Sequence, residues 1–476
     1  MTDDRNGDSG SLAETNMTIR ALAGGGDGIG QWQGQTVFVP HVAPGDVIRP
    51  SDPVRSGGRF RAADFELVTP GPGRVDPACP RWRTCGGCQW MQVDDRVQVE
   101  QKQALLERAF RGAHLDVGRF LPMTPSPKTL GYRRRARLAW QGRDGTVALG
   151  FLGSASHDVV DVTTDPACPV LEPALQRVLA PVRRALEVWI SSFAPGGVLL
   201  QGQVMLLADW RGRVQVAVEM DRQAGRPKRS KSAKPLDNHG PRNLFRQGPI
   251  RAVPGALGEL LEDPDVVSVG ISTRKGWVWR GADRLDLDDP EQGGLLGRAD
   301  GFSQANRLLN ESIRDQVREA ASGAKSVLEL YAGSGNLTRI LAEPNRLVTA
   351  VEKDRAAVQA ILDARGSWPG RVHVRRSDAE RFLQSEKIER LDVDLVVLDP
   401  PRSGSKQVAK SLCRLAHRSG PQRNPHRILS ISCDPMTAAR DLKVLSECGF
   451  GIDLVAGFDS MPQTSHFELL CLASLA

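Results

Sequence analysis

A cysteine stands at the end of a predicted buried strand near the carboxyl terminus. Residues 427–432 read RILSIS, and Cys433 follows them directly. In an open α/β sheet, ligands bind in the crevice beyond the carboxyl ends of the strands, so Cys433 would face that crevice. Residues 437–442 predict a helix, whose amino end would favour the thiolate form of the sulfur. This position indicates a nucleophilic thiol, with a buried core cysteine as the alternative.

Four other cysteines have the spacing of metal ligands. Cys79, Cys85 and Cys88 lie on a turn-rich loop, and Cys168 follows far downstream in a similar proline-flanked context. Two cysteines separated by two glycines are hard to explain by core packing. Four thiolates hold either a structural zinc ion or an iron–sulfur cluster, and the spacing leaves both open.

A glycine-containing loop and an acidic strand end predict a site for a nucleoside-containing cofactor. The predicted strand 326–330 runs into residues 331–336, YAGSGN, and a second strand ends at Glu352. Glycines let the backbone approach a ligand, and an acid placed this way accepts from ribose hydroxyls. Asp378, after a further strand, is placed to meet an adenine edge. The chain has no Gly-x4-Gly-Lys-[Ser/Thr] loop, which disfavours an ATPase, and S-adenosylmethionine fits the pattern.

Residues 131–140, GYRRRARLAW, place arginines and two aromatic residues in one predicted strand. Arginine neutralises phosphate and aromatic rings stack on unpaired bases, so this strand is the best local candidate for contact with RNA. A solvated charged strand is the alternative. The arginines in question are Arg133, Arg134, Arg135 and Arg137.

Composition indicates a soluble protein of several domains. The chain has 476 residues, of which 40% are hydrophobic and 25% are charged. No apolar run approaches the ~20 residues that a membrane span needs, and the amino terminus is not signal-like, so we expect a cytoplasmic protein without membrane contact. The net charge of +7 indicates an anionic partner such as nucleic acid. Without a secretion signal, the cysteines argue against a disulfide framework, and the last four look mostly like core: Cys413, Cys433, Cys448 and Cys471.

The predicted elements divide the chain into a tail and three domains. Residues 1–16 are expected to be a disordered tail, and short strands with glycine-rich turns at 17–70 predict a small β-barrel of a kind that binds oligonucleotides. Residues 71–295 predict a central α+β RNA-binding domain that carries the four-cysteine site and a flexible basic insertion at 221–248. Residues 296–476 alternate strands and helices, which predicts a doubly wound, Rossmann-like α/β domain.

From about residue 17 to 476, the chain resembles the RNA (uracil-5-)-methyltransferase family, closest to its iron–sulfur-containing 23S ribosomal RNA branch. The barrel is similar to a TRAM (or OB-like) domain, and the four-cysteine pattern matches as well. The remaining likeness lies in Gly301-Phe302-Ser303-Gln304-Ala305-Asn306, Glu329-Leu330-Tyr331-Ala332-Gly333-Ser334-Gly335-Asn336, Leu398-Asp399-Pro400-Pro401-Arg402, Ser432-Cys433-Asp434-Pro435 and His466-Phe467-Glu468.

The resemblance implies the residues of a methyltransferase site. Cys433 would be the nucleophile, Glu468 the general base and S-adenosylmethionine the methyl donor. The partner would be RNA, with 23S rRNA favoured, and we expect a monomer. The resemblance implies cofactor contacts from Gln304, Tyr331, Asn336, Glu352, Asp378 and Asp399. It also implies a [4Fe-4S] cluster on Cys79, Cys85, Cys88 and Cys168.

The expected reaction makes 5-methyluridine through a covalent bond between Cys433 and C6 of uracil. C5 is a poor nucleophile, but addition of a thiolate at C6 makes it electron-rich. After C5 takes the methyl group, Glu468 would remove the C5 proton and the thiolate would leave. The base must be unpaired or flipped out. Asp434 stands where family members often have asparagine, and its charge would raise the pKa of the thiol unless it is turned away or paired.

Other functions stay open at the level of sequence. One is a transfer RNA uracil-5 methyltransferase with the same architecture, and another is a non-catalytic RNA-binding or assembly factor. The latter would allow the cofactor residues to decay, yet they are all present. Asp399-Pro400-Pro401 is also similar to the Asp-Pro-Pro-Tyr motif of enzymes that methylate exocyclic amines, but Arg402 stands in place of the aromatic residue and those enzymes need no thiol.

Overall fold

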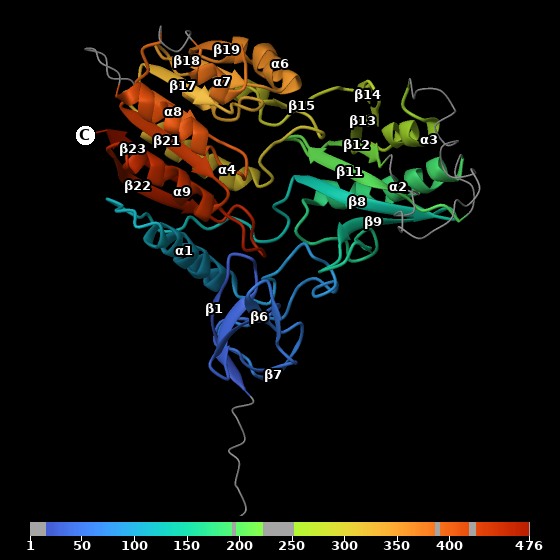
Figure 1. The fold of residues 1–476 in the computed structure, drawn as a ribbon. Helices are drawn as coiled ribbons and strands as arrows, with labels where there is room; N and C mark the ends of the chain where they lie inside the picture. The colour runs from blue at the N-terminus through green and yellow to red at the C-terminus, as the bar shows by residue number, and fades with distance from the viewer. Residues whose placement is uncertain (1–15, 193–196, 222–251, 386–390, 418–424, 476) are drawn as a thin grey trace, which may run out of the picture. The chain divides into compact units, whose positions relative to one another are not determined.

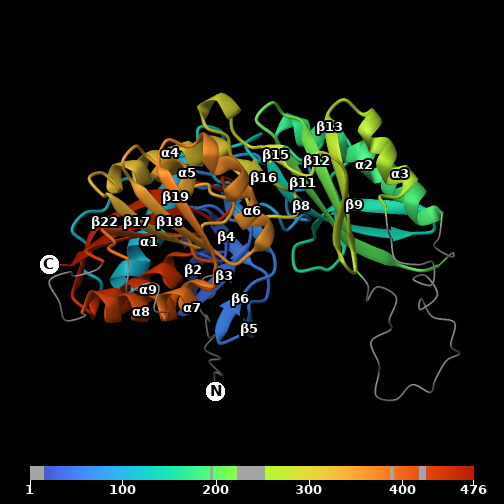
Figure 2. The same cartoon turned by 90° about the horizontal axis from the view of Figure 1, so that it is seen from above.

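The computed structural model describes residues 16–192, 197–221, 252–385, 391–417 and 425–475 (Figures 1 and 2). The chain forms two compact units. The first comprises Met1–Ala78, Cys88–Gln101 and Gln463–Ser465, and the second comprises Cys79–Gly87, Lys102–Pro462 and His466–Ala476. The predicted tail, except Asn16, and the predicted basic insertion, except Asp221, lie outside the described residues.

The first unit contains a curled, seven-stranded sheet with the strand order β5-β6-β3-β2-β1-β4-β7. Its core comes from alternating apolar residues, such as Met17 and Ile19 on β1 and Val37 and Val39 on β3. The prediction of short strands is confirmed, but the sheet is a half-barrel: it ends at β5 and β7, which are largely exposed. The strands are β1 (Met17–Leu22), β2 (Gly28–Trp32), β3 (Gln35–Val39), β4 (Val47–Pro50), β5 (Val54–Ser56), β6 (Arg59–Arg61) and β7 (Phe65–Thr69).

The second unit begins with a mixed sheet in the order β10-β9-β8-β11-β12-β13-β14. Helix α2 (Pro173–Ser191) packs its apolar face against β9 and β11. A helix, α1 (Asp95–Gly112), precedes this sheet in the chain. The strands are β8 (Arg135–Arg143), β9 (Thr146–Leu152), β10 (Val159–Asp161), β11 (Leu200–Ala208), β12 (Val214–Met220), β13 (Val266–Thr273) and β14 (Gly276–Gly281).

The carboxyl-terminal third forms a sheet in the order β19-β18-β17-β20-β21-β23-β22. The first five strands of this order are parallel, whereas β23 is antiparallel to both β21 and β22. The strands are β17 (Ser326–Leu330), β18 (Leu347–Glu352), β19 (Arg371–Arg376), β20 (Leu395–Leu398), β21 (Arg427–Ser432), β22 (Phe450–Phe458) and β23 (Glu468–Leu475).

Helices cover both faces of this sheet, as the predicted Rossmann-like fold requires. In Figure 2, α4, α5 and α6 lie on one face and α7, α8 and α9 on the other. Apolar residues of α4, such as Ile313 and Val317, share one core with β17 and β18. The helices are α4 (Arg307–Ala320), α5 (Thr338–Leu341), α6 (Arg355–Ala364), α7 (Ala379–Leu383), α8 (Lys406–Ala416) and α9 (Pro435–Ser446).

Two cysteines expected in the core form a disulfide. Cys413 on α8 is bonded to Cys448, which follows α9, and their Cα atoms are 5.8 Å apart. The sequence-based expectation of core thiols is therefore wrong for this pair, because two residues distant in sequence meet where α8 packs on α9. Within the described ranges, no helix is both long and apolar enough to cross a membrane.

Candidate active site

Strand directions bring Cys433 and Glu468 to the same edge of the sheet. Strand β23 is antiparallel to β21, and Ser432, the last residue of β21, pairs with Leu469. Cys433 and Glu468 are the next residues outward on the two strands, so they are neighbours across the strand ends. Leu398, the last residue of β20, pairs with Ser430, which places Asp399 at the same edge. A thiol and two carboxyl groups therefore gather beyond the carboxyl ends of the parallel strands.

The surroundings of Cys433 favour the neutral thiol. The pKa of Cys433 is raised to about 11, mainly by burial. The neighbouring carboxylates of Glu468 and Asp399 contribute to this increase. The guanidinium of Arg402 acts in the opposite direction, through its charge and a hydrogen bond to the sulfur. Arg402 is thus the positive group that the motif Asp399-Pro400-Pro401-Arg402 supplies to the thiol.

Both carboxyl groups also hold protons more tightly than usual. Burial raises the pKa of Glu468 to about 8, with a further increase from Asp399 and a decrease from Arg402. Burial raises the pKa of Asp399 to about 6. A carboxyl group with a pKa close to neutral is suited to accept and return a proton. Glu468 therefore has the proton affinity that a general base at this edge needs.

Asp434, the residue after the thiol, is engaged by a helix. Its Oδ1 accepts a hydrogen bond from the amide of Thr437 at 2.7 Å, so it caps the amino end of α9. His466 lies nearby: burial, Arg402 and Lys102 lower the pKa of its imidazole, and Asp434 raises it.

The loop after β17 is shaped to approach a ligand. Tyr331, Gly333 and Gly335 all have positive φ angles, of 64°, 56° and 96°. A Cβ atom on Gly335 would lie 2.9 Å from the Trp368 ring, so glycine is required there. The amide of Gly333 donates to Oε2 of Glu352 at 3.0 Å. The glycine loop and the acid at the end of β18 therefore meet, as the sequence predicts.

Tyr331 and Asp378 also lie close together. Burial raises the pKa of the Tyr331 phenol to about 12, and the carboxylate of Asp378 contributes to that rise. Asp378 caps α7 by accepting from the amides of Glu380 and Arg381, at 3.1 and 3.3 Å. The phenol is thus kept neutral, as a hydrogen-bond donor beside an acceptor.

Asn336 is held by α4. Its Oδ1 accepts from Nδ2 of Asn310 at 2.9 Å and from Nη2 of Arg314 at 2.8 Å. Arg314 is fully buried and also forms an ion pair with Asp288 at 2.7 Å. Arg314 was not predictable from the sequence, because a lone arginine on an amphipathic helix carries no signal of its own. In the structure, α4 positions the loop 331–336 through this network.

Gln304 lies on a loop that the central sheet holds in place. The backbone amide of Arg134 donates to the carbonyl of Ala305 at 2.9 Å, and its guanidinium donates to the carbonyls of Leu287, at 2.8 Å, and Gln304, at 3.3 Å. Arg134 is only 1% exposed. This burial corrects the sequence-based assignment of Arg134 to RNA contact, since its role here is to hold the loop.

The other members of the arginine strand differ in exposure. Arg133 lies over the ring of Phe151, Arg135 donates to the carbonyl of Gly301 at 2.6 Å, and Arg137 is exposed. RNA contact by these three arginines stays a prediction. The two aromatic residues of the segment, Tyr132 and Trp140, are buried in the core and offer no stacking surface, which corrects that part of the expectation.

Glu329 is a buried acid to which the sequence pattern assigns no role. It lies on β17 with 2% exposure, and its Oε2 has no hydrogen-bond partner in the described part of the chain. Burial raises its pKa to about 8, with smaller increases from Asp399 and Glu352. The sequence does contain a signal for this residue: a single acid lies inside the apolar strand that precedes the glycine loop.

The predicted cysteine site is not preformed. Among the residues that the structure describes, no group of three or more His, Cys, Asp or Glu side chains is arranged to hold a metal ion. Burial raises the pKa of Cys168 to about 11, and Cys79 and Cys85 raise it as well, so these three thiols lie within electrostatic reach of one another. Thiols are suitable ligands for a zinc ion or an iron–sulfur cluster, but these thiols are not arranged around a common metal position in the described part of the chain.

Comparison with known proteins identifies the family of the chain. Residues 297–474 match the family described as tRNA (Uracil-5-)-methyltransferase. The 23S rRNA (uracil(1939)-C(5))-methyltransferase RlmD of Chromohalobacter salexigens is 31% identical over 468 residues, covering 96% of this chain and 88% of the relative. The protein with the same name from Alkalilimnicola ehrlichii is 30% identical, covering 96% and 95% of the two chains.

A solved structure has the same fold. It is the Pyrococcus abyssi tRNA (uracil-54, C5)-methyltransferase in complex with S-adenosyl-L-homocysteine, with a TM-score of 0.66 and 22% identity. The match covers 96% of this chain and 99% of that one, so the half-barrel, the central sheet and the Rossmann-like domain all take part. With two relatives at or above 30% identity over nearly its whole length, the chain belongs to the RNA (uracil-5-)-methyltransferase family.

Proposed function

We propose that this protein methylates C5 of a uracil in 23S rRNA, with Cys433 as the nucleophile and Glu468 as the general base. The observation that carries the proposal is the register of β21 with β23, which makes the two residues neighbours at the ligand-binding edge of the sheet. Catalysis of RNA uracil-C5 methylation with S-adenosylmethionine is the activity of the family. The choice of ribosomal RNA rests on the names of the relatives that match over the whole chain.

The residues at this edge suit S-adenosylmethionine. Glu352, at the end of β18, would accept from the ribose, and Asp378 and Tyr331 would flank the adenine. Two carboxyl groups, Glu468 and Asp399, and one guanidinium, Arg402, act on the pKa of Cys433, so a cation would be stabilised near the carboxyl groups. When bound, the cofactor supplies an electrophilic methyl group on a positively charged sulfonium.

Cys433 and Glu468 would divide the work on the base. The thiolate of Cys433 forms a bond to C6 of the uracil, which moves electron density to C5. Once C5 carries the methyl group, its proton passes to the carboxylate of Glu468. The C6–S bond then breaks, the ring double bond is restored and the thiolate returns. Arg402, which donates a hydrogen bond to the sulfur, would stabilise the thiolate at both ends of this sequence.

Product analysis tests the proposed function. The protein is incubated with unmodified 23S rRNA and isotopically labelled S-adenosylmethionine, and the nucleosides are separated after digestion. We expect labelled 5-methyluridine. Label found only in methylcytidine or methyladenosine would contradict the assignment.

The alternative substrate is transfer RNA. It is favoured by one observation, the full-length structural match to a tRNA methyltransferase. Comparing unmodified 23S rRNA and tRNA under the same conditions separates the two. Loss of 5-methyluridine from one of these RNAs in a deletion strain identifies the substrate in the cell.

Two further assignments belong to this proposal. The half-barrel would serve as a TRAM-like RNA-binding module, and Cys79, Cys85 and Cys168, with Cys88 from the sequence motif, would hold a [4Fe-4S] cluster. Cys79 acts to raise the pKa of both Cys85 and Cys168, and Cys85 acts to raise that of Cys168, which supports clustering of the three thiols. No catalytic step is assigned to this group. Iron, sulfide and zinc analysis of anaerobically purified protein decides between a cluster, a zinc ion and neither.

A further inference from the structure

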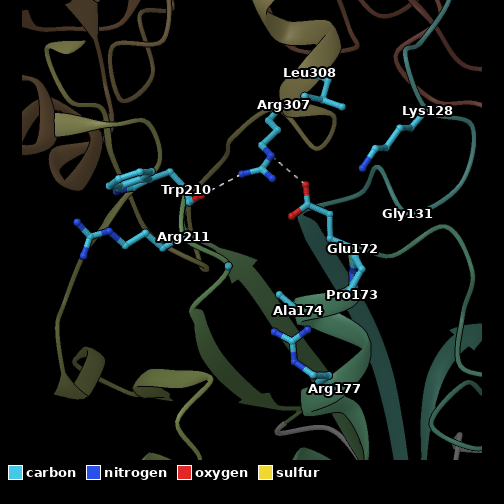
Figure 3. A pocket seen from close by; sticks show the side chains of 11 residues that line it. Lys128, Gly131, Glu172, Pro173, Ala174, Arg177, Trp210, Arg211, Arg307 and Leu308 are labelled. Atoms are coloured by element: carbon cyan, nitrogen blue, oxygen red, sulfur yellow. Dashed lines mark hydrogen bonds and ion pairs between the residues drawn. The ribbon is translucent and has the colours of Figure 1, made fainter. Parts of the chain in front are cut away.

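A pocket of about 370 Å³ lies apart from the thiol, at the start of two helices (Figure 3). It is formed by the loop before β8, the amino ends of α2 and α4, and the turn between β11 and β12. This size falls in the range of about 300–1,000 Å³ that small ligands occupy. The residues that matter for its chemistry are Lys128, Glu172, Arg177, Trp210, Arg211 and Arg307.

The charges of this pocket are unbalanced. Lysine and three arginines face a single carboxylate, that of Glu172, which is paired with Arg307 at 3.3 Å. Arg307 also donates to the carbonyl of Trp210 at 3.2 Å, so these three residues form one side of the pocket (Figure 3). Arg177 is paired with Asp265 at 2.6 Å. The pocket therefore carries excess positive charge.

Two of the cations form no ion pair among the described residues. The ammonium of Lys128 is exposed, and its positive charge acts to lower the pKa of the nearby Glu172 carboxyl group. Arg211 is exposed too, and its guanidinium lies over the indole ring of Trp210, 4.6 Å from the ring centroid. These groups are available to an anion that enters from solvent.

The amino end of α2 adds to this preference for an anion. Its cap residue, Glu172, makes no side-chain hydrogen bond to the helix, because the carboxylate faces Arg307 instead. Pro173 has no N–H, so the amide of Ala174 is the first donor of the helix. The partial positive charge of an uncapped helix of 19 residues favours a negative group near that amide.

The aromatic residue distinguishes a nucleotide from a simple anion. Trp210 is only partly buried, and the stack of its ring with the planar guanidinium of Arg211 provides a flat surface. Unpaired bases stack on tryptophan rings and on arginine planes, while their phosphates pair with lysine and arginine. An acidic peptide would use the cations but not this surface.

The pocket adjoins the loop that carries Gln304. Asn306 caps α4 by accepting from the amide of Leu309 at 3.1 Å, and Arg307 is the first residue of that helix. Nδ2 of Asn306 also donates to Oγ of Ser126 at 2.8 Å, two residues before Lys128. A ligand in the pocket would therefore contact Arg307, close in the chain to the loop of Gln304, which is predicted to contact the cofactor.

We propose that this pocket binds one nucleotide of the RNA substrate other than the methylated uridine, with its phosphate on Lys128 and the amino end of α2 and its base against Trp210 and Arg211. The inference rests on the proposed function for the identity of the RNA. Binding of this nucleotide would hold the RNA strand so that the uridine to be methylated reaches Cys433.

Binding of a short, labelled, single-stranded RNA that contains uracil tests this site. Replacing Trp210 by Ala should weaken binding by about fivefold or more, because a lost base stack is worth that much. Replacing Lys128 or Arg211 by Ala should weaken it as well, and Lys128→Ala should reduce the slope of log affinity against log salt by about 0.7. Affinity for S-adenosylmethionine should stay at the wild-type value in all three variants, which checks that they are folded.

Matched surface changes provide the control. One control is Arg318→Ala, because Arg318 lies on α4 about 16 Å from Arg307 along the helix. The other is Lys275→Ala, because Lys275 lies in the turn between β13 and β14. Both should leave RNA affinity nearly unchanged. If the three pocket variants bound RNA like these controls, the pocket assignment would be overturned. Competition by polyglutamate as strong as that by RNA would equally exclude a nucleotide site.

Product formation by the wild-type protein keeps the two proposals apart. A wild-type protein that makes 5-methyluridine while its pocket variants bind RNA normally refutes the pocket alone. A wild-type protein that makes no 5-methyluridine refutes the proposed function, whereas weakened binding by the pocket variants would still support a nucleotide site.

Discussion

Asp434 caps α9: its carboxylate accepts a hydrogen bond from the Thr437 amide at 2.7 Å. The carboxylate next to Cys433 is thereby turned toward the positive end of a helix of 12 residues. This geometry explains how an aspartate is accommodated directly after Cys433. Aspartate and asparagine side chains can both accept the same hydrogen bond at a helix amino end.

Exchange of Asp434 should therefore affect stability through the cap. Asp434→Asn keeps the acceptor, and we expect it to retain most of the methylation rate and stability. Asp434→Ala removes the acceptor and should lower the free energy of unfolding by about 1 kcal/mol. Thermal unfolding and methylation assays of both variants measure this. A large loss of activity in Asp434→Asn would show instead that the charge acts on the thiol.

Variants of the candidate nucleophile and base should fail at different steps. Cys433→Ala lacks the nucleophile and should lose roughly a thousandfold or more in turnover, with no covalent RNA complex. Glu468→Gln keeps the thiol but cannot take the C5 proton, so a denaturant-stable complex with RNA should accumulate. Gel analysis with labelled RNA detects it. Full turnover by Glu468→Gln without a complex would remove Glu468 from the mechanism.

The reactivity of Cys433 should depend on its neighbours. The thiolate is the reactive form, and with a pKa of about 11 only a small fraction is present at neutral pH. Alkylation by iodoacetamide should therefore accelerate as pH rises toward that value. At a pH above about 8, where Glu468 is ionised, Glu468→Gln removes a negative charge and should speed alkylation. Arg402→Gln removes a positive charge and should slow alkylation.

Peptide mass spectrometry measures the alkylation of Cys433 separately from that of the other thiols. The peptide with Cys433 is compared with that of Cys471, which is buried. Equal rates in wild type, Glu468→Gln and Arg402→Gln would show that these groups do not act on the sulfur.

Glu329 should make stability depend on pH. Burial raises its pKa from the usual 4.5 to about 8, so the folded protein holds a proton that the unfolded chain releases between those values. Stability is therefore full below pH 4.5 and decreases as pH rises to about 8, by at most about 1.4 kcal/mol per pH unit. Glu329→Gln carries no such proton, so it should gain stability relative to wild type over this window.

Unfolding by urea at several pH values checks this prediction. The difference between Glu329→Gln and wild type should grow from pH 5 to about pH 8 and then level off. Glu447→Gln, the same exchange at an exposed position, serves as the control. A difference for Glu329→Gln that does not vary with pH would contradict a protonated Glu329.

Replacement of two arginines in the same segment should change the stability of the protein to different extents. Arg134 is buried and bonded to main-chain carbonyls, so Arg134→Ala should destabilise the protein by about 2–4 kcal/mol. Arg137 is exposed, and Arg137→Ala should leave stability within about 0.5 kcal/mol. If it touches RNA, Arg137→Ala weakens binding in high and low salt to different extents. Equal destabilisation by both changes would contradict the difference in burial.

The local sequence was sufficient to predict which groups meet at the carboxyl ends of the parallel strands. Cys433, Glu352 and Asp399 each follow an apolar run, and parallel strands present their carboxyl ends at one edge, so chain order alone predicts that these residues meet. The glycine loop at 331–336 was predictable for the same reason, because its turn is a local requirement. The role of Glu468 was predicted from the family resemblance and not from the spacing of residues.

Only the tertiary structure decided the contacts that depend on strand direction and packing. Glu468 reaches Cys433 because β23 is antiparallel to β21, and a hydrophobic run does not encode its own direction. Arg134 reads as a charged surface residue in sequence, yet it is buried because carbonyls from distant loops satisfy it. The nucleotide pocket likewise joins four separate segments, and no local pattern records their meeting.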